Sequence, residues 1–171
     1  YMAELGHTVS TGGAKGADSA FIDGAMQGNG VIQNYLPFPG YNGYRTNLMP
    51  YDQSKKVMDL AKKYHPAWNR CSPTARLMHA RNCNIILGQH LSQPVDFILC
   101  WTPDGLAVGG SGQGLRLAKD YNIPVCNLGK AKTDEEAFEM LQTLKEDIEH
   151  GLATIETSLT GDFKLFGDYY E

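Results

Sequence analysis

The sequence of 171 residues contains no apolar run long enough to cross a bilayer, and no basic start leads into an apolar signal segment. These absences argue against a membrane-spanning or secreted protein, so we predict a cytoplasmic location and no membrane partner. Cysteine is also scarce, because the chain has four and none of them forms a CxxC pair. We therefore expect reduced thiols rather than a disulfide framework.

Recognisable zinc motifs are missing as well. Cys71, His79 and Cys83 lie at intervals that could hold zinc, but they include no CxxC pair and have no fourth ligand nearby. We predict no metal and no cofactor.

A strongly basic balance, on which non-specific binding to single-stranded nucleic acid depends, is absent too: the net charge is −4. The charge is uneven, however. Between Arg45 and Arg81, eight basic residues stand against two acidic ones. This segment either attracts anions or, in the alternative, its lysines form the solvated side of a helix.

A glycine-rich segment near the start is the first candidate for a binding site. A β-favouring run over 8–10 precedes three glycines, and Asp18 is expected to cap an apolar helix. Glycine permits positive φ and close approach of the backbone to a ligand, and free N–H groups at a helix start favour an anion such as phosphate. A tight turn with nothing bound is the alternative. The candidate ligand-binding residues here are Gly12, Gly13, Ala14, Lys15, Gly16 and Asp18.

A second glycine segment follows the most strand-like run of the chain, 95–101, which we predict to be a central parallel strand covered on both faces. The glycines of 109–114 lead into a helix, and 123–128 is the next predicted strand. Repeated strand–helix–strand units predict an α/β fold with an open parallel sheet and helices on both faces. Ligands bind at the carboxyl ends of such strands, so we expect both loops to face one ligand. The candidates here are Trp101, Gly109, Gly110, Ser111, Gly112 and Gln113.

The remaining elements follow from periodicity and capping signals. Residues 1–6 resemble the last turns of a helix closed by Gly6, so we expect the first strand of the sheet to precede this sequence. Helices are predicted over 52–64, from Ser72-Pro73 to Gly88, and from the capping box at Thr133 to Gly151, with a strand over 31–36. We predict a single domain over 1–151, followed by a tail over 152–171.

The segment 39–47 is rich in aromatic, glycine and amide residues, and we expect it to rim the ligand crevice. Arg45 is its only charged residue and is a candidate for bidentate contact with phosphate or carboxylate. An ordinary surface loop is the alternative. Two further candidates, Arg81 and Asn82, lie on the helix that begins at Ser72.

Three segments resemble known families. Residues 11–18 (TGGAKGAD) resemble the "SGGAxGAD" loop of the DNA processing protein A (Smf) family, and Arg81-Asn82 followed by Ile85-Ile86 is similar to its "RNRII" segment. Residues 109–112 (GGSG) resemble the "GGxGT" loop of the lysine-decarboxylase-like "lonely guy" phosphoribohydrolases, and 78–81 (MHAR) their "MHxRK" helix. Both groups belong to one Rossmann-like superfamily, SLOG, and the resemblance spans about residues 1 to 130.

The resemblance implies a Rossmann-like fold that binds a nucleotide, a nucleotide-derived signal or a nucleic-acid strand. Binding of a nucleotide-derived ligand through both glycine loops is the first hypothesis. Cleavage of a nucleoside-monophosphate N-glycosidic bond, with Arg81 as a catalytic residue, is the second. The catalytic glutamate of "GGxGTxxE" is missing here, since the aligned positions hold Gln113 and Arg116. Asp18 and Asp104 are candidates to substitute for it, but nothing in the sequence positions them. Binding of single-stranded DNA is the third, and a homo-oligomer is expected.

Overall fold

The computed structural model of the chain describes residues 1–45 and 54–149. The chain forms two compact units, Tyr1–Val95 and Asp96–Glu171, and each is described by itself. Both units combine helices with a pair of parallel strands, which confirms the α/β class. The single domain and the open Rossmann-like sheet stay predictions.

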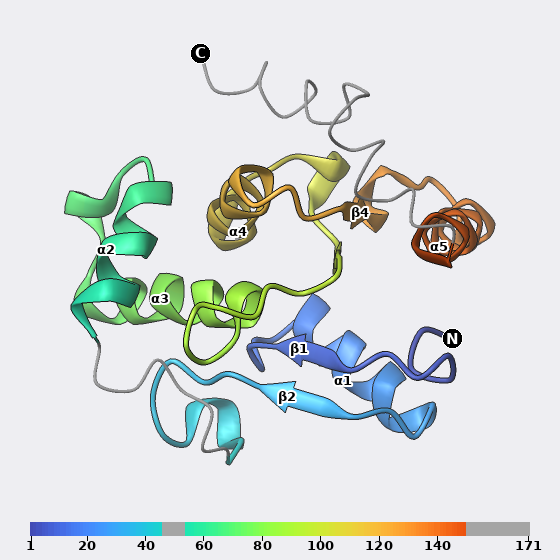
Figure 1. Cartoon of the computed structure of the whole chain (residues 1–171), viewed down its shortest axis with the longest axis horizontal. Helices are drawn as coiled ribbons and strands as arrows, with labels where there is room; N and C mark the ends of the chain where they lie inside the picture. The colour runs from blue at the N-terminus through green and yellow to red at the C-terminus, as the bar shows by residue number, and fades with distance from the viewer. Residues whose placement is uncertain (46–53, 150–171) are drawn as a thin grey trace. The chain divides into compact units, whose positions relative to one another are not determined.

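The first unit begins with a strand–helix–strand motif (Figure 1). Strands β1 (Val9–Thr11) and β2 (Ile32–Asn34) are parallel, with Ser10 opposite Gln33, and helix α1 (Ala17–Gln27) connects them. Parallel strands require such a crossover. Strand β2 is shorter than the predicted 31–36, because it pairs only where β1 lies opposite it, from Ile32 to Asn34.

Helix α1 does not begin as predicted. Its N-cap is Gly16, with φ +95°, so the prediction that Asp18 caps the helix is wrong. The Asp18 carboxylate accepts a hydrogen bond from the N–H of Ala14, which precedes the helix, and it also pairs with Arg81. Glycine tolerates the positive φ that this helix start requires, and the aspartate is thereby left for long-range contacts.

Two packed helices complete the first unit. Helix α2 (Lys55–Tyr64) buries Val57, Ala61 and Tyr64 and packs against α3 (Pro73–Leu87), with a 3₁₀ turn, η3 (Trp68–Arg70), between them. The Ser72 hydroxyl accepts from Ala75 N at 3.2 Å, and Gly88 ends α3 with φ +75°. The predicted bounds of α3 are confirmed, whereas the start predicted for α2 at Asp52 lies outside the described residues.

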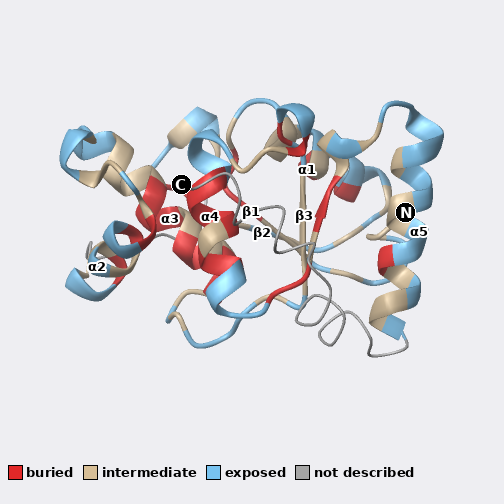
Figure 2. Cartoon of the chain, turned by 90° about the horizontal axis from the view of Figure 1, so that it is seen from above, coloured by how far each residue is buried: buried red, intermediate tan, exposed pale blue. Residues whose placement is uncertain are grey.

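The second unit repeats the motif with β3 (Ile98–Cys100), α4 (Gly109–Asp120) and β4 (Val125–Asn127), and Leu99 lies opposite Cys126 in parallel register. Strand β3 is short and only half-buried, so the predicted long strand covered on both faces is wrong. The glycine loop predicted over 109–114 is also wrong, because these residues already form the first turns of α4. Buried positions are concentrated on α3 and α4 (Figure 2).

Asn127 connects the two 3₁₀ turns of the second unit, η4 (Pro103–Gly105) and η5 (Leu128–Lys130). Its side-chain amide donates to Thr102 Oγ1 at 2.7 Å and to Gly105 O at 3.1 Å. Its Oδ1 accepts from Thr102 N and Gly129 N, both at 3.1 Å. Because Asn127 is 2% exposed, this buried network holds the carboxyl ends of β3 and β4 together.

Helix α5 (Asp134–Glu149) closes the described chain. The Thr133 hydroxyl accepts from Glu136 N at 3.2 Å, which confirms the first half of the predicted capping box, whereas the Glu136 carboxylate accepts from Lys132 N and not from Thr133 N. Leu144 is the buried residue of this helix. Gly151 and the tail lie outside the described residues. All four cysteines are free thiols, as predicted. Within 1–45 and 54–149, no helix has the length and apolar character needed to span a membrane.

Candidate functional site

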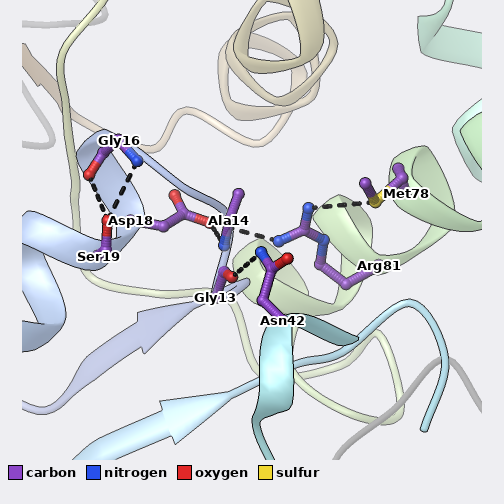
Figure 3. Close-up of polar contacts among 8 residues, drawn as sticks. All are labelled: Gly13, Ala14, Gly16, Asp18, Ser19, Asn42, Met78 and Arg81. Carbon is purple, nitrogen blue, oxygen red and sulfur yellow. Dashed lines mark hydrogen bonds and ion pairs between the residues drawn. The ribbon is translucent and has the colours of Figure 1, made fainter. Parts of the chain in front are cut away.

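The first unit brings the glycine turn after β1 together with the middle of α3 and the 3₁₀ turn η1 (Tyr41–Gly43). Figure 3 shows Arg81 of α3 and Asn42 of η1 converging on this turn. The turn lies at the carboxyl end of a parallel strand, where α/β proteins place their ligand sites.

Gly12 is a glycine because Arg81 needs the space beside it. A Cβ atom at Gly12 would lie 1.1 Å from Arg81 Nη1 and 2.2 Å from Cζ. Arg81 is 5% exposed, and its Nη2 donates to Met78 Sδ at 3.8 Å. The glycine therefore allows a buried guanidinium group to lie directly against the backbone of the turn.

Asp18 balances part of this buried charge. Its Oδ2 accepts from Ala14 N at 3.1 Å and from Arg81 Nη1 at 3.4 Å. Burial lowers the pKa of Arg81, and the Asp18 charge opposes that shift. Arginine stays protonated in proteins, so the site holds an ion pair whose carboxylate is 33% exposed.

The predicted rim segment does contact the glycine turn. Asn42 Nδ2 donates to Gly13 O at 2.8 Å, and Tyr41 places its ring 6.0 Å from the Arg81 guanidinium carbon. A Cβ at Gly13 would lie 2.9 Å from the Tyr44 ring and 3.0 Å from the Asn34 amide. Arg45 is exposed, and its contact with an anion stays a prediction.

Several polar groups around the turn have no partner among the described residues. Arg81 Nε and Asn34 Oδ1 are buried without a hydrogen bond. The N–H groups of Ala17, Asp18 and Ser19 belong to the first turn of α1, where no carbonyl of the helix can accept from them. Ser19 Oγ is already engaged, since it accepts from Gly16 N at 3.1 Å. Around the turn, Arg81 Nε and Asn34 Oδ1 are thus buried polar atoms without a hydrogen bond, and the first-turn N–H groups of α1 can only bond to a partner outside the helix.

The other predicted site residues are placed differently. Lys15 and Gly16 are exposed on the turn, and Asn82 is half-buried on α3. In the second unit, Trp101 is 53% exposed, and the first residues of α4, 109–111, are exposed. Gln113 is fully buried within α4, and its contact with a ligand stays a prediction.

Position 112 is a glycine for a structural reason, because a Cβ atom there would lie 2.3 Å from Ala107 O. Close backbone packing within the unit therefore requires this glycine. Asp104, one of the acids considered as a substitute for the missing glutamate, is exposed on η4. Asp18, the other, is the one that the structure pairs with an arginine.

The structure adds two amide residues that the sequence analysis did not select. Asn34 ends β2 and Asn42 lies in the rim segment, and both contact the glycine turn as described above. A signal for Asn34 was present, because it is a polar residue at the carboxyl end of the strand that follows the glycine helix. No family model, curated protein or solved structure matches the chain.

Proposed function

We propose that the protein binds a nucleotide or nucleotide-derived ligand, with the ligand's phosphate at the glycine turn of the first unit. The observation that carries the proposal is the buried Arg81 guanidinium, which lies against Gly12 and has an unsatisfied Nε. The first-turn N–H groups of α1 and the dipole of that helix favour an anion at the same turn.

A nucleotide fits this turn better than a bare anion because Asp18 is part of it. A carboxylate repels phosphate but accepts hydrogen bonds from hydroxyl groups, which ribose supplies. Asn34 Oδ1 is a further buried acceptor, and the Tyr41 and Tyr44 rings beside the turn offer surfaces on which a base can stack. A nucleotide combines the anion, the hydroxyl donors and the aromatic base in one molecule.

The proposal includes the Rossmann-like open parallel sheet that the SLOG resemblance implies. This proposed sheet is supported by the strand–helix–strand motif in each unit, where the two strands pair in parallel. The prediction that the second glycine segment serves the same ligand stays a prediction, as do the homo-oligomer and the cytoplasmic location.

The test is isothermal titration of the intact chain with AMP, CMP, adenosine and inorganic phosphate. We expect at least one nucleoside monophosphate to bind more tightly than both the nucleoside and phosphate. Arg81→Lys should weaken that binding by about tenfold to a hundredfold, because lysine keeps the charge but loses the planar fork. No heat of binding with any of these compounds at millimolar concentration would refute the proposal.

Arg76→Lys is the matched control, since Arg76 lies on the same helix but stacks over the Trp68 ring at 5.5 Å. It should leave nucleotide affinity unchanged. An equal loss in both variants would show that the effect comes from α3 in general and not from the glycine turn.

Hydrolysis of the N-glycosidic bond is the second candidate function, and the Asp18–Arg81 pair favours it. A carboxylate that stabilises an oxocarbenium-like centre is what such cleavage requires. If this function is present, the chain releases free base from a nucleoside monophosphate, and Asp18→Asn abolishes release while binding persists. Chromatography of the incubated nucleotide measures it, and unchanged nucleotide after prolonged incubation excludes this activity for the compound tested.

Single-stranded DNA is the other ligand implied by the resemblance. An oligonucleotide in the same titrations should then bind with an affinity that falls steeply as salt rises. Affinity for the oligonucleotide that is independent of salt would contradict strand binding.

A further inference from the structure

A second cluster of reactive side chains lies in the first unit, away from the glycine turn. It contains His65, the residue that caps the C-terminus of α2, Cys71, which follows η3, and His79 in the middle of α3. Their ligand atoms all lie within 4.8 Å of one another. We propose that these three side chains bind zinc, a site that goes beyond the proposed nucleotide function.

The distances are close to those of a tetrahedral centre. Cys71 Sγ lies 3.6 Å from His65 Nδ1 and 3.7 Å from its Nε2, and the two imidazole rings are 4.2 Å apart between centroids. Zinc bonds of about 2.0–2.1 Å to nitrogen and 2.3 Å to sulfur place donor atoms about 3.3–3.6 Å from one another. The thiol and His65 already meet this separation, and all the ligand atoms lie within 4.8 Å of one another. Side-chain movements of about 1 Å would bring them to the tetrahedral separation.

The donor set also selects the metal. One thiolate and two imidazoles form a mixed sulfur–nitrogen set, which suits zinc rather than magnesium or calcium. Three protein ligands leave a fourth position for water or an added ligand, as in zinc sites that keep an open coordination position.

Binding requires two local changes in protonation and hydrogen bonding. Cys71 loses its thiol proton to solvent as the sulfur–zinc bond forms. His65 Nδ1 accepts a hydrogen bond from Ala67 N at 3.1 Å, and coordination through either ring nitrogen removes that bond. If Nδ1 binds zinc, its lone pair is donated to the metal and can no longer accept a hydrogen bond. If Nε2 binds zinc, Nδ1 carries the ring proton and cannot accept either. The cost is therefore two hydrogen bonds at partly buried positions, the one from Ala67 N and the bond that the Cys71 thiol donates to Ala67 O at 3.7 Å.

The cluster differs from the one considered in the sequence. Cys83, which the sequence pairs with Cys71 and His79, is fully buried, and its thiol donates to the His79 carbonyl at 3.6 Å. His65 replaces Cys83 as the third possible ligand, because η3 turns the chain back after α2 and brings residue 71 beside residue 65. Trp68 lies beside the two imidazoles, 6.3 Å from His65 and 6.5 Å from His79 between ring centroids, and so provides an optical probe.

The experiment uses the intact, untagged chain, freed of metal with a chelator and titrated with Co²⁺ in the absence of nucleotide. We expect the visible spectrum of tetrahedral cobalt, a thiolate-to-cobalt band in the near ultraviolet, and loss of both when Zn²⁺ is added. In a Trp101→Phe background, Co²⁺ should quench the emission of Trp68.

Cys71→Ser should remove the thiolate band and weaken cobalt binding at least tenfold, and His65→Gln should weaken it similarly. His79 is buried, so the test does not depend on replacing it. Cys100→Ser is the matched control, because Cys100 is also half-buried but lies on β3, and it should leave the spectrum unchanged. A thiolate band that survives Cys71→Ser, or absence of tetrahedral cobalt in the parent chain, would overturn the proposal. Because no nucleotide is present, this outcome is independent of the proposed function.

Discussion

Replacing Gly12 by alanine tests the central packing contact of the glycine turn. No positive φ is required at this residue, so the new methyl group is the source of the penalty. That methyl would lie 1.1 Å from Arg81 Nη1, and the guanidinium must leave its place against the turn. The ion pair with Asp18 is then broken, with a buried charge left uncompensated.

The expected cost is about 3 kcal/mol, the lower end of the range for breaking a buried ion pair, because Asp18 is partly exposed. Urea unfolding measures it, followed by the emission of Trp68 in a Trp101→Phe background so that the signal reports on the first unit. Gly24→Ala is the control. An added Cβ at Gly24, in α1, meets nothing within 4 Å, and alanine there should stabilise the unit by about 0.5–1 kcal/mol.

A double-mutant cycle identifies the cause of the effect. In an Arg81→Ala background, Gly12→Ala should cost less than about 1 kcal/mol, because the group that clashes is gone. If the two changes are additive, the guanidinium is not the reason for glycine at this position, and the account of the turn given above is wrong.

Two further predictions concern the second unit. Gly129→Ala should destabilise it by about 2–3 kcal/mol, measured by thermal unfolding, because its Cβ would lie 1.7 Å from the backbone oxygen of Thr102. A neutral effect would show that the close approach of η5 to η4 is not maintained in solution. Burial raises the pKa of Cys100 to about 12 and that of Cys126 to about 11, so both thiols keep their protons at pH 8. A thiolate-selective reagent should therefore label them at least tenfold more slowly than free cysteine, with rates that rise as pH increases towards those values. Peptide mapping measures the rates, and labelling of Cys100 as fast as that of free cysteine at pH 8 would contradict the prediction.

Local signals in the sequence predicted local structure well. Ser72-Pro73 and Gly88 mark the ends of α3 because capping and backbone preference act within a few residues. Thr133 marks the start of α5 for the same reason. Strand length was predicted poorly, since apolar runs such as 95–101 continue beyond the residues that pair, and pairing depends on the neighbouring strand.

Long-range contacts explain what the sequence could not predict about the site. Arg81 was selected from a motif, but nothing in the chain's order shows that its guanidinium reaches Gly12 and Asp18, far away along the sequence. The sequence also does not predict that His65 lies beside Cys71 and His79, because their proximity depends on the path of η3 between two helices.

The glycines of this chain show why a glycine-rich motif is ambiguous when read alone. A glycine indicates that something approaches the backbone closely, but the pattern does not say what. At Gly12 it is the side chain of Arg81, at Gly112 the carbonyl of Ala107 just before α4, and at Gly129 the backbone of Thr102. Only the first of these glycines lies against a charged group with an unsatisfied nitrogen. Arg81 and the first-turn amides of α1 are therefore what indicates a ligand at the first turn, and the number of glycines indicates nothing further.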